Sequence, residues 1–76
     1  FSRQKYFSSW PVIAGVRLSS CTKLDSFDLK KGKIYVKANS LSSRSLLIME
    51  KTRIIKAWNS FFKDAPIKEI VVVKGY

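Results

Sequence analysis

The residues with the clearest chemical potential are basic and aromatic, and they gather on one short stretch of the chain. Lys30, Lys31 and Lys33 fall within four positions, and Tyr35 and Lys37 follow on alternate residues. Ammonium groups at this density bind phosphate oxygens, and an aromatic ring between two lysines can stack on an unpaired base. The pattern predicts contact with a nucleic acid. The alternatives are a solvated turn for the lysines and an ordinary exposed strand residue for the tyrosine.

A second basic group recurs at helical spacing later in the chain. Arg53, Lys56 and Lys63 fall on one side of a helix whose other side is apolar. This side is either a further phosphate-binding surface or the solvated back of the helix. The candidate nucleic-acid-binding residues are accordingly Lys30, Lys31, Lys33, Tyr35, Lys37, Arg53 and Lys56.

The whole chain is strongly basic. Fifteen Lys and Arg stand against five Asp and Glu in 76 residues, a formal net charge of +10. Residues 1–38 hold eight basic and two acidic groups (+6), and residues 39–76 hold seven and three (+4). A disordered basic tail would concentrate the charge in one block. We therefore expect one folded domain, spanning residues 1–76, that displays its charge to a polyanion.

The residues that enzymes use for acid–base, nucleophilic or metal chemistry are sparse. The chain has no His, so the thiol of Cys21 lacks an activating base. The nearest carboxylates, Asp25 and Asp28, are three positions apart, and a regular strand would place them on opposite faces. No glycine-rich phosphate loop occurs. We expect no catalytic residue, no enzymatic activity, no metal and no cofactor.

Two features bear on the compartment. A single cysteine, Cys21, allows no intramolecular disulfide. The longest purely aliphatic stretch, Ile70–Val73, is far shorter than the roughly 18 residues of a membrane span. Both favour the cytoplasm and no membrane partner. Because the chain begins at Phe1 and not at Met, we expect it to be a fragment of a slightly longer protein.

The elements that would position the basic stretch begin with a helix. Phe7, Trp10 and Ile13 recur at helical spacing and predict a helix over residues 4–20, with Gly15 either ending it or lying inside it.

Two strands are predicted next, at Thr22–Lys30 and Lys33–Ala38, with a tight turn at Gly32 between them. Alternation along the second strand puts Ile34, Val36 and Ala38 on one face and the predicted site on the other.

The second half of the chain predicts one long helix and one strand. The helix runs over Ser42–Phe62, after serines that can cap its first turn. Its predicted core face consists of Leu47, Ile54, Trp58, Phe61 and Phe62, with Ile48 and Ile55 at the edge. The final strand, Ile67–Lys74, contains an unbroken apolar run that indicates burial on both faces.

The predicted order is α-β-β-α-β. Two helices packed on one face of a three-stranded sheet would close a single core, which is an α+β fold of the KH-like kind. A KH domain that clamps RNA carries a GxxG loop. Gly15 is followed by Val16, Arg17 and Leu18, so that loop is missing and any binding must use side chains of the sheet and helices.

An ordered series of residues runs through nearly the whole chain: Trp10, Val12, Ile13, Gly15, Thr22, Gly32, Ile34, Tyr35, Val36, Ser40, Arg44, Leu47, Ile54, Ile55, Asn59, Ile67, Ile70 and Gly75. This series resembles the DciA family of bacterial replication proteins. The resemblance implies a KH-like domain without GxxG, binding to single-stranded or junction DNA, and a DnaB-type replicative helicase as partner. It also implies a loader or operator of that helicase.

A second hypothesis shares the charge and the fold but not the helicase. A KH-like module could bind ribosomal or messenger RNA through the same basic and aromatic side chains. A weaker third reading is a protein-interaction domain whose positive charge meets an acidic partner. Neither the oligomeric state nor the preference between DNA and RNA follows from these patterns.

Overall fold

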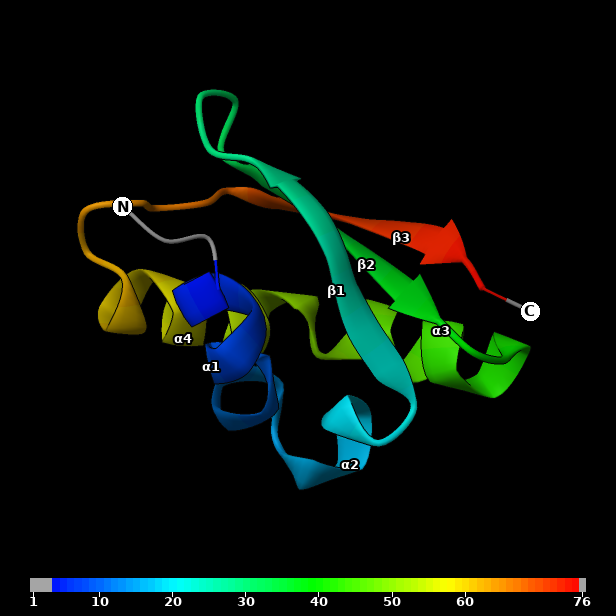
Figure 1. Ribbon diagram of the computed structural model, residues 1–76. Helices are drawn as coiled ribbons and strands as arrows, with labels where there is room; N and C mark the ends of the chain where they lie inside the picture. Colours follow the sequence, from blue (N-terminus) through cyan, green and yellow to red (C-terminus); the bar gives the residue numbers. More distant parts are fainter. Residues whose placement is uncertain (1–3, 76) are drawn as a thin grey trace.

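A computed structural model describes residues 4–75 of the chain, and in this part it has four helices and three strands (Figure 1). The elements are α1 (Gln4–Ala14), α2 (Val16–Ser19), β1 (Thr22–Asp28), β2 (Lys33–Ala38), α3 (Leu41–Met49), α4 (Lys51–Phe61) and β3 (Glu69–Lys74). The helices pack against one face of the sheet (Figure 1). The α+β class and the α-β-β-α-β order are confirmed, but each predicted helix is divided in two.

Both helix breaks have a local cause. Gly15 has a φ of 93°, a conformation that residues with a Cβ rarely adopt, so α1 ends before it and α2 starts after it. Glu50 has φ −94° and ψ 4°, outside the helical region, and separates α3 from α4. The continuous helix predicted over residues 42–62 was therefore wrong, and of the two alternatives for Gly15 the structure has the one in which the first helix ends there. Ser40 caps α3 by accepting a hydrogen bond from the Ser43 N–H at 3.1 Å.

The sheet is mixed, in the order β1-β2-β3. Strands β1 and β2 are antiparallel, whereas β2 and β3 are parallel. A β-bulge at Asp25 interrupts the first ladder, since Leu24 pairs with Val36 and Ser26 pairs with Tyr35. The extra residue lets Leu24 and Phe27, three positions apart, both pack into the core.

The bulge also changes the position of the two aspartates. Asp25 lies 3.9 Å from Lys37 Nζ, and Asp28 pairs opposite Lys33. Lys33 and Lys37 alternate with buried residues of β2 and point away from the helices, so both carboxylates lie on that outer face. The prediction that they lie on opposite faces was wrong because it assumed a regular strand.

Strand β3 is an edge strand and is buried less than its sequence indicates. Ile70 is 2% exposed, but Val71, Val72 and Val73 are only half-buried. The predicted burial on both faces was wrong, because no helix among the described residues covers the outer face of the sheet (Figure 1).

No described helix is long and apolar enough to span a bilayer.

The core lies between the helices and the inner face of the sheet. Trp10 and Trp58 are 3% and 0% exposed, and both indole N–H groups are satisfied, by Thr22 Oγ1 at 3.3 Å and by the Ala65 carbonyl at 2.8 Å. The predicted core positions Leu47, Ile54, Trp58 and Phe62 are buried. Phe61 is not, at 52% exposed: it is the last residue of α4, and its ring lies against Phe62.

Candidate nucleic-acid interface

Strand β2 places three of the predicted binding residues on the uncovered face of the sheet. Its buried residues Ile34, Val36 and Ala38 are each 0% exposed and face the helices. Lys33, Tyr35 and Lys37 alternate with them and therefore point outward. The central strand of the sheet thus carries an aromatic ring between two ammonium groups, as its sequence predicts.

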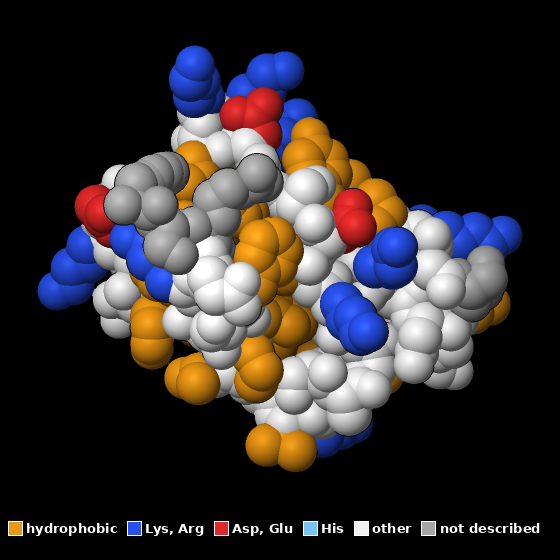
Figure 2. All heavy atoms as spheres, in the orientation of Figure 1, with side chains coloured by type: hydrophobic (Ala, Val, Ile, Leu, Met, Phe, Trp, Pro, Cys, Tyr) orange, Lys and Arg blue, Asp and Glu red, His pale blue; other side chains and the backbone are white. Residues whose placement is uncertain are grey.

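Strand β3 extends this face with apolar side chains. In the parallel register, Val71 lies beside Tyr35 and Val73 beside Lys37. Tyr35, Val71 and Val73 form what we call the apolar strip of the outer face. On the other side of Lys37, Lys23 of β1 is its cross-strand partner. In Figure 2, hydrophobic side chains run along the upper right of the sheet, with basic side chains above and below them.

The hairpin between β1 and β2 brings further lysines to one end of the apolar strip. The Asp28 carboxylate and carbonyl both accept from the Lys31 N–H, at 3.3 and 3.2 Å, which closes the turn. Gly32 has a φ of 68°, the positive value that returns the chain into β2. Lys30 and Lys31 are exposed at this turn.

A fourth lysine joins them from a distant part of the chain. The Gly32 carbonyl accepts hydrogen bonds from the Lys68 N–H at 2.7 Å and the Glu69 N–H at 3.1 Å. A Cβ on Gly32 would lie 3.3 Å from Lys68 Cγ, so the two segments are in close contact. Residues 66–68 and the hairpin together line a shallow hollow. We call the cluster Lys30, Lys31, Lys33 and Lys68 the basic tip.

Lys68 was absent from the residues predicted from the sequence. It is 35 positions from Lys33, and only the parallel pairing of β2 with β3 brings the two together. Lys68 could have been predicted only by assuming this parallel register, in which Lys33 lies beside Glu69, the residue after Lys68. Asn59 holds the segment in place, since its amide donates to the Ile67 carbonyl at 3.0 Å and accepts from the Ile67 N–H at 2.7 Å.

Two carboxylates lie close to the basic tip, and each has a partner. The Asp28 carboxylate accepts the Lys31 N–H in the turn. Glu69 forms an ion pair with Lys51 at 3.0 Å and accepts from the Ile70 N–H at 3.1 Å. The Lys51 hydrogen bond, the Ile70 backbone hydrogen bond and the nearby positive charges lower the pKa of Glu69. Glu69 therefore stays ionised beside Lys33 and orders the start of β3.

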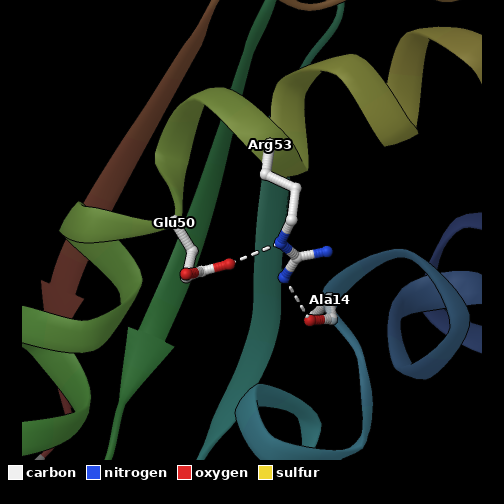
Figure 3. Close-up of polar contacts among 3 residues, drawn as sticks. All are labelled: Ala14, Glu50 and Arg53. Atoms are coloured by element: carbon white, nitrogen blue, oxygen red, sulfur yellow. Dashed lines mark hydrogen bonds and ion pairs between the residues drawn. The ribbon is translucent and has the colours of Figure 1, made fainter.

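The remaining predicted residues, Arg53 and Lys56, belong to α4 in the helical layer. The Arg53 guanidinium forms an ion pair with Glu50, and its Nη2 donates to the Ala14 carbonyl at 2.8 Å (Figure 3). It thus links the end of α1 to the start of α4. Lys56 is exposed on α4. The structure does not bring these two residues together with the outer face of the sheet.

This arrangement is suited to binding phosphates and bases. Within residues 4–75, no three His, Cys, Asp or Glu side chains are grouped closely enough to hold a metal ion. Four ammonium groups at the end of an open, partly apolar sheet face can bind phosphate oxygens while the aromatic ring contacts a base.

Comparison with known proteins agrees with the resemblance found in the sequence. No curated protein matches the chain. A family model described as "Dna[CI] antecedent, DciA" matches residues 1–72 of the 76. The match spans the helical layer and most of the sheet, including the basic tip. The chain therefore belongs to the DciA family, and this membership implies a role in loading the DnaB-type replicative helicase.

Proposed function

We propose that this protein is a DNA-binding adaptor that holds single-stranded DNA on the outer face of its sheet while it engages the DnaB-type helicase. The helicase partner follows from family membership. The DNA partner and the residues that contact it are our proposal.

The observation that carries the proposal is the position of the basic tip. The two hydrogen bonds to the Gly32 carbonyl gather four lysines at one end of the outer face, and the two neighbouring carboxylates are occupied by the turn and by Lys51. The lysines are therefore available for phosphates. A protein that neutralises phosphates releases their counterions, which supplies most of the binding free energy for a sequence-tolerant partner.

Tyr35 supports a single strand as the ligand in preference to a duplex. Its ring lies on the central strand between Lys33 and Lys37 and beside Val71. Unpaired bases can stack on such a ring, for about 1–3 kcal/mol per base, whereas paired bases are already stacked. Lys37 Nζ lies 3.9 Å from the Asp25 carboxylate, and both side chains are well exposed. Because an exposed ion pair of this kind contributes little free energy, Lys37 can exchange Asp25 for a phosphate.

The proposed action is binding without catalysis. An adaptor that holds DNA and helicase together makes their encounter local, which can raise the overall avidity by about 10²–10⁴-fold even when each contact is weak.

The test is a titration of fluorescent single-stranded DNA, duplex DNA and single-stranded RNA with wild-type protein and with Tyr35→Ala and Tyr35→Phe. We expect tightest binding to single-stranded DNA, a loss of about fivefold or more with Tyr35→Ala and little loss with Tyr35→Phe, which keeps the ring. A loading assay with the cognate helicase on single-stranded DNA follows. Tighter binding to RNA than to DNA, with no enhancement of loading, would support the RNA-binding alternative.

A further inference from the structure

A second pair of lysines lies at the end of β2 away from the basic tip. Lys23 of β1 and Lys37 of β2 are direct partners across the antiparallel ladder, and both are exposed. Residues directly opposite each other share a face of the sheet, so Lys23 joins Lys37 on the outer face. Like charges placed in this way repel each other. An anion bound between the two ammonium groups would remove this repulsion.

The protein itself neutralises this pair only in part. Asp25 approaches Lys37 Nζ to 3.9 Å, and the two side chains are 44% and 50% exposed. Lys23 forms no ion pair within residues 4–75. The two lysines and one aspartate therefore leave a positive charge at this end of the sheet.

A hollow of about 220 Å³ lies beside the two lysines. Apart from them it is lined by Ser19, Ser20, Cys21, Thr22, Asn39 and Gly75. No described Asp or Glu lines it. One water molecule occupies about 30 Å³ in the liquid, so the hollow has room for a phosphate group together with several waters.

Asn39 adds an uncharged donor to the wall of this hollow. Its backbone N–H donates to the Cys21 carbonyl at 3.1 Å, which holds residue 39 beside the start of β1. Its Oδ1 accepts from Ser43 Oγ at 2.8 Å, which sets the orientation of the amide. The Nδ2 group makes no hydrogen bond within residues 4–75, so it is available to a ligand.

The hydroxyl groups in the hollow are already in use as donors. Ser19 Oγ donates to the Val16 carbonyl at 3.2 Å, and Ser20 Oγ donates to the Arg17 carbonyl at 2.8 Å. The side-chain donors left for an anion are therefore two ammonium groups and one amide. This is a set that binds phosphate oxygens.

The distance between the two ends of β2 fits a short stretch of DNA. Lys33 in the basic tip and Lys37 are four positions apart (37 − 33), which is about 13 Å at 3.3 Å per residue. Tyr35 lies midway between them on the same face. A stacked strand advances about 3.4 Å per nucleotide, so about four nucleotide steps cover this distance.

We propose that Lys23, Lys37 and Asn39 form a second phosphate site, which we call the far site, and that single-stranded DNA runs along β2 from the basic tip over Tyr35 to it. The proposal rests on the proposed function, because it takes the outer face as the DNA-binding surface. It adds the path of the strand, and it requires an oligonucleotide of about five nucleotides or more to reach both sites.

The experiment compares fluorescent oligothymidylates of three and eight nucleotides. One further phosphate changes the salt slope by only about 0.7, so the length of the strand is the sharper readout. Lys23→Gln should weaken the eight-nucleotide strand by about two- to fivefold and leave the three-nucleotide strand, which the basic tip holds alone, unchanged. Lys63→Gln removes the same charge after α4 and should not change the ratio of the two affinities.

The side-chain amide of Asn39 gives a direct readout. Asn39 and Asn59 are the two asparagines of the chain, and the Asn59 amide is bonded to the backbone of Ile67. In an NMR titration of ¹⁵N-labelled protein, the Asn39 Nδ2 resonances should shift with the eight-nucleotide strand and not with the three-nucleotide strand. The Asn59 resonances should not distinguish the two strands.

Three results would overturn the far site: an Asn39 amide that does not respond to the longer strand, equal weakening of both strands by Lys23→Gln, or no more weakening by Lys23→Gln than by Lys63→Gln. Tyr35→Ala on the same strands separates this failure from failure of the proposed function. If Tyr35→Ala weakens binding and Lys23→Gln does not, the DNA crosses the outer face by another path. If neither variant weakens binding, the outer face is not the DNA-binding surface.

Discussion

At the scale of single residues, the basic side chains divide into those with an ion-pair partner inside the protein and those without one among residues 4–75. Lys51 is paired with Glu69 at 3.0 Å, and Arg53 with Glu50. The exposed lysines of the hairpin turn, Lys30 and Lys31, have no ion pair within residues 4–75. Position in the sequence does not distinguish these two kinds of basic residue, but the structure does.

The first prediction concerns the basic tip. Replacing Lys30, Lys31 and Lys33 together by Gln should weaken binding to single-stranded DNA by about tenfold at low salt, since exposed charge pairs contribute about 0.2–1 kcal/mol each. The fold should survive, because none of these three lysine side chains belongs to the core. The control is Lys56→Gln with Lys63→Gln, in the helical layer. A larger loss in the control would place the DNA on the helices.

The second prediction concerns the largest buried side chain. Trp58 is 0% exposed, stacks against Tyr6 with ring centroids 5.6 Å apart and donates to the Ala65 carbonyl. Trp58→Ala should lower the free energy of unfolding by about 3–5 kcal/mol, which is a large part of the stability of a domain this small. Urea unfolding followed by circular dichroism measures the loss. A stable variant that has lost only DNA binding would contradict the assignment of Trp58 to the core.

The third prediction is a pH dependence. Lys51 lowers the pKa of Glu69 in the folded protein, so Glu69 contributes stability above its ordinary pKa of about 4.3 and loses that contribution as the pH falls through the lower folded value. Glu69→Gln should therefore be less stable than wild type at pH 7, and the difference should shrink below about pH 4. Urea unfolding of wild type and Glu69→Gln at a series of pH values measures the difference in their free energies of unfolding and its change with pH. A difference that does not change with pH would contradict an electrostatic role.

At the scale of elements, the loop between α4 and β3 determines where Lys68 lies. Asn59 makes two hydrogen bonds to the backbone of Ile67, next to Lys68. The Asn59 side chain is half-buried. Among the hydrogen bonds of the described residues, no other group bonds to the Ile67 N–H or carbonyl.

The fourth prediction follows from that clamp. Asn59→Ala should cost about 1–3 kcal/mol, because it leaves two backbone groups without their partner, and it should also weaken DNA binding by loosening Lys68. Hydrogen exchange of the Ile67 and Lys68 amides should report local opening before global unfolding. Ser60→Ala, one position away and exposed, is the matched control and should change neither. Unchanged exchange at Ile67 would argue against the clamp.

The element order and most of the core follow from the sequence, and the exceptions have physical reasons. Hydrophobic periodicity located the strands and the buried stripe through Ile54 and Trp58. It could not decide whether the helix ends at Gly15 and it missed the break at Glu50, because the apolar pattern continues across both residues while the helical backbone does not. The valines of β3 predicted a strand buried on both faces. The order of the strands in the sheet, which makes β3 an edge strand, cannot be inferred from the composition of β3 alone.

The candidate site was predictable only in part, for a similar reason. Lys33, Tyr35 and Lys37 share a face through the alternation of a single strand, which is a local property. Lys68 joins them through pairing between distant segments. Arg53 reads as an exposed basic residue, but its guanidinium is bound to Glu50 and Ala14, partners that periodicity does not reveal. Whether Arg53 and Lys56 contact DNA stays a prediction.

At the scale of the whole molecule, the net charge of +10 governs how binding depends on salt. The fifth prediction is that the logarithm of the DNA-binding constant falls with the logarithm of salt concentration with a slope near −3. This is the value for about four phosphates neutralised on a single strand, one for each lysine of the basic tip. Titrations between about 50 and 200 mM salt measure it. A salt-independent affinity would contradict electrostatic binding.

The parallel pairing of β2 with β3 has a consequence for how the protein is made. The β1–β2 hairpin closes through a short turn, but Lys33 and Glu69 pair across 36 positions (69 − 33), and pairings this distant form late in folding. A chain that leaves the ribosome from its amino terminus delivers β3 after β1 and β2. Until then the Lys68 N–H does not donate to the Gly32 carbonyl, and the basic tip lacks its fourth lysine. The nascent chain, surrounded by ribosomal RNA, thus acquires its complete polyanion-binding surface only when the sheet closes.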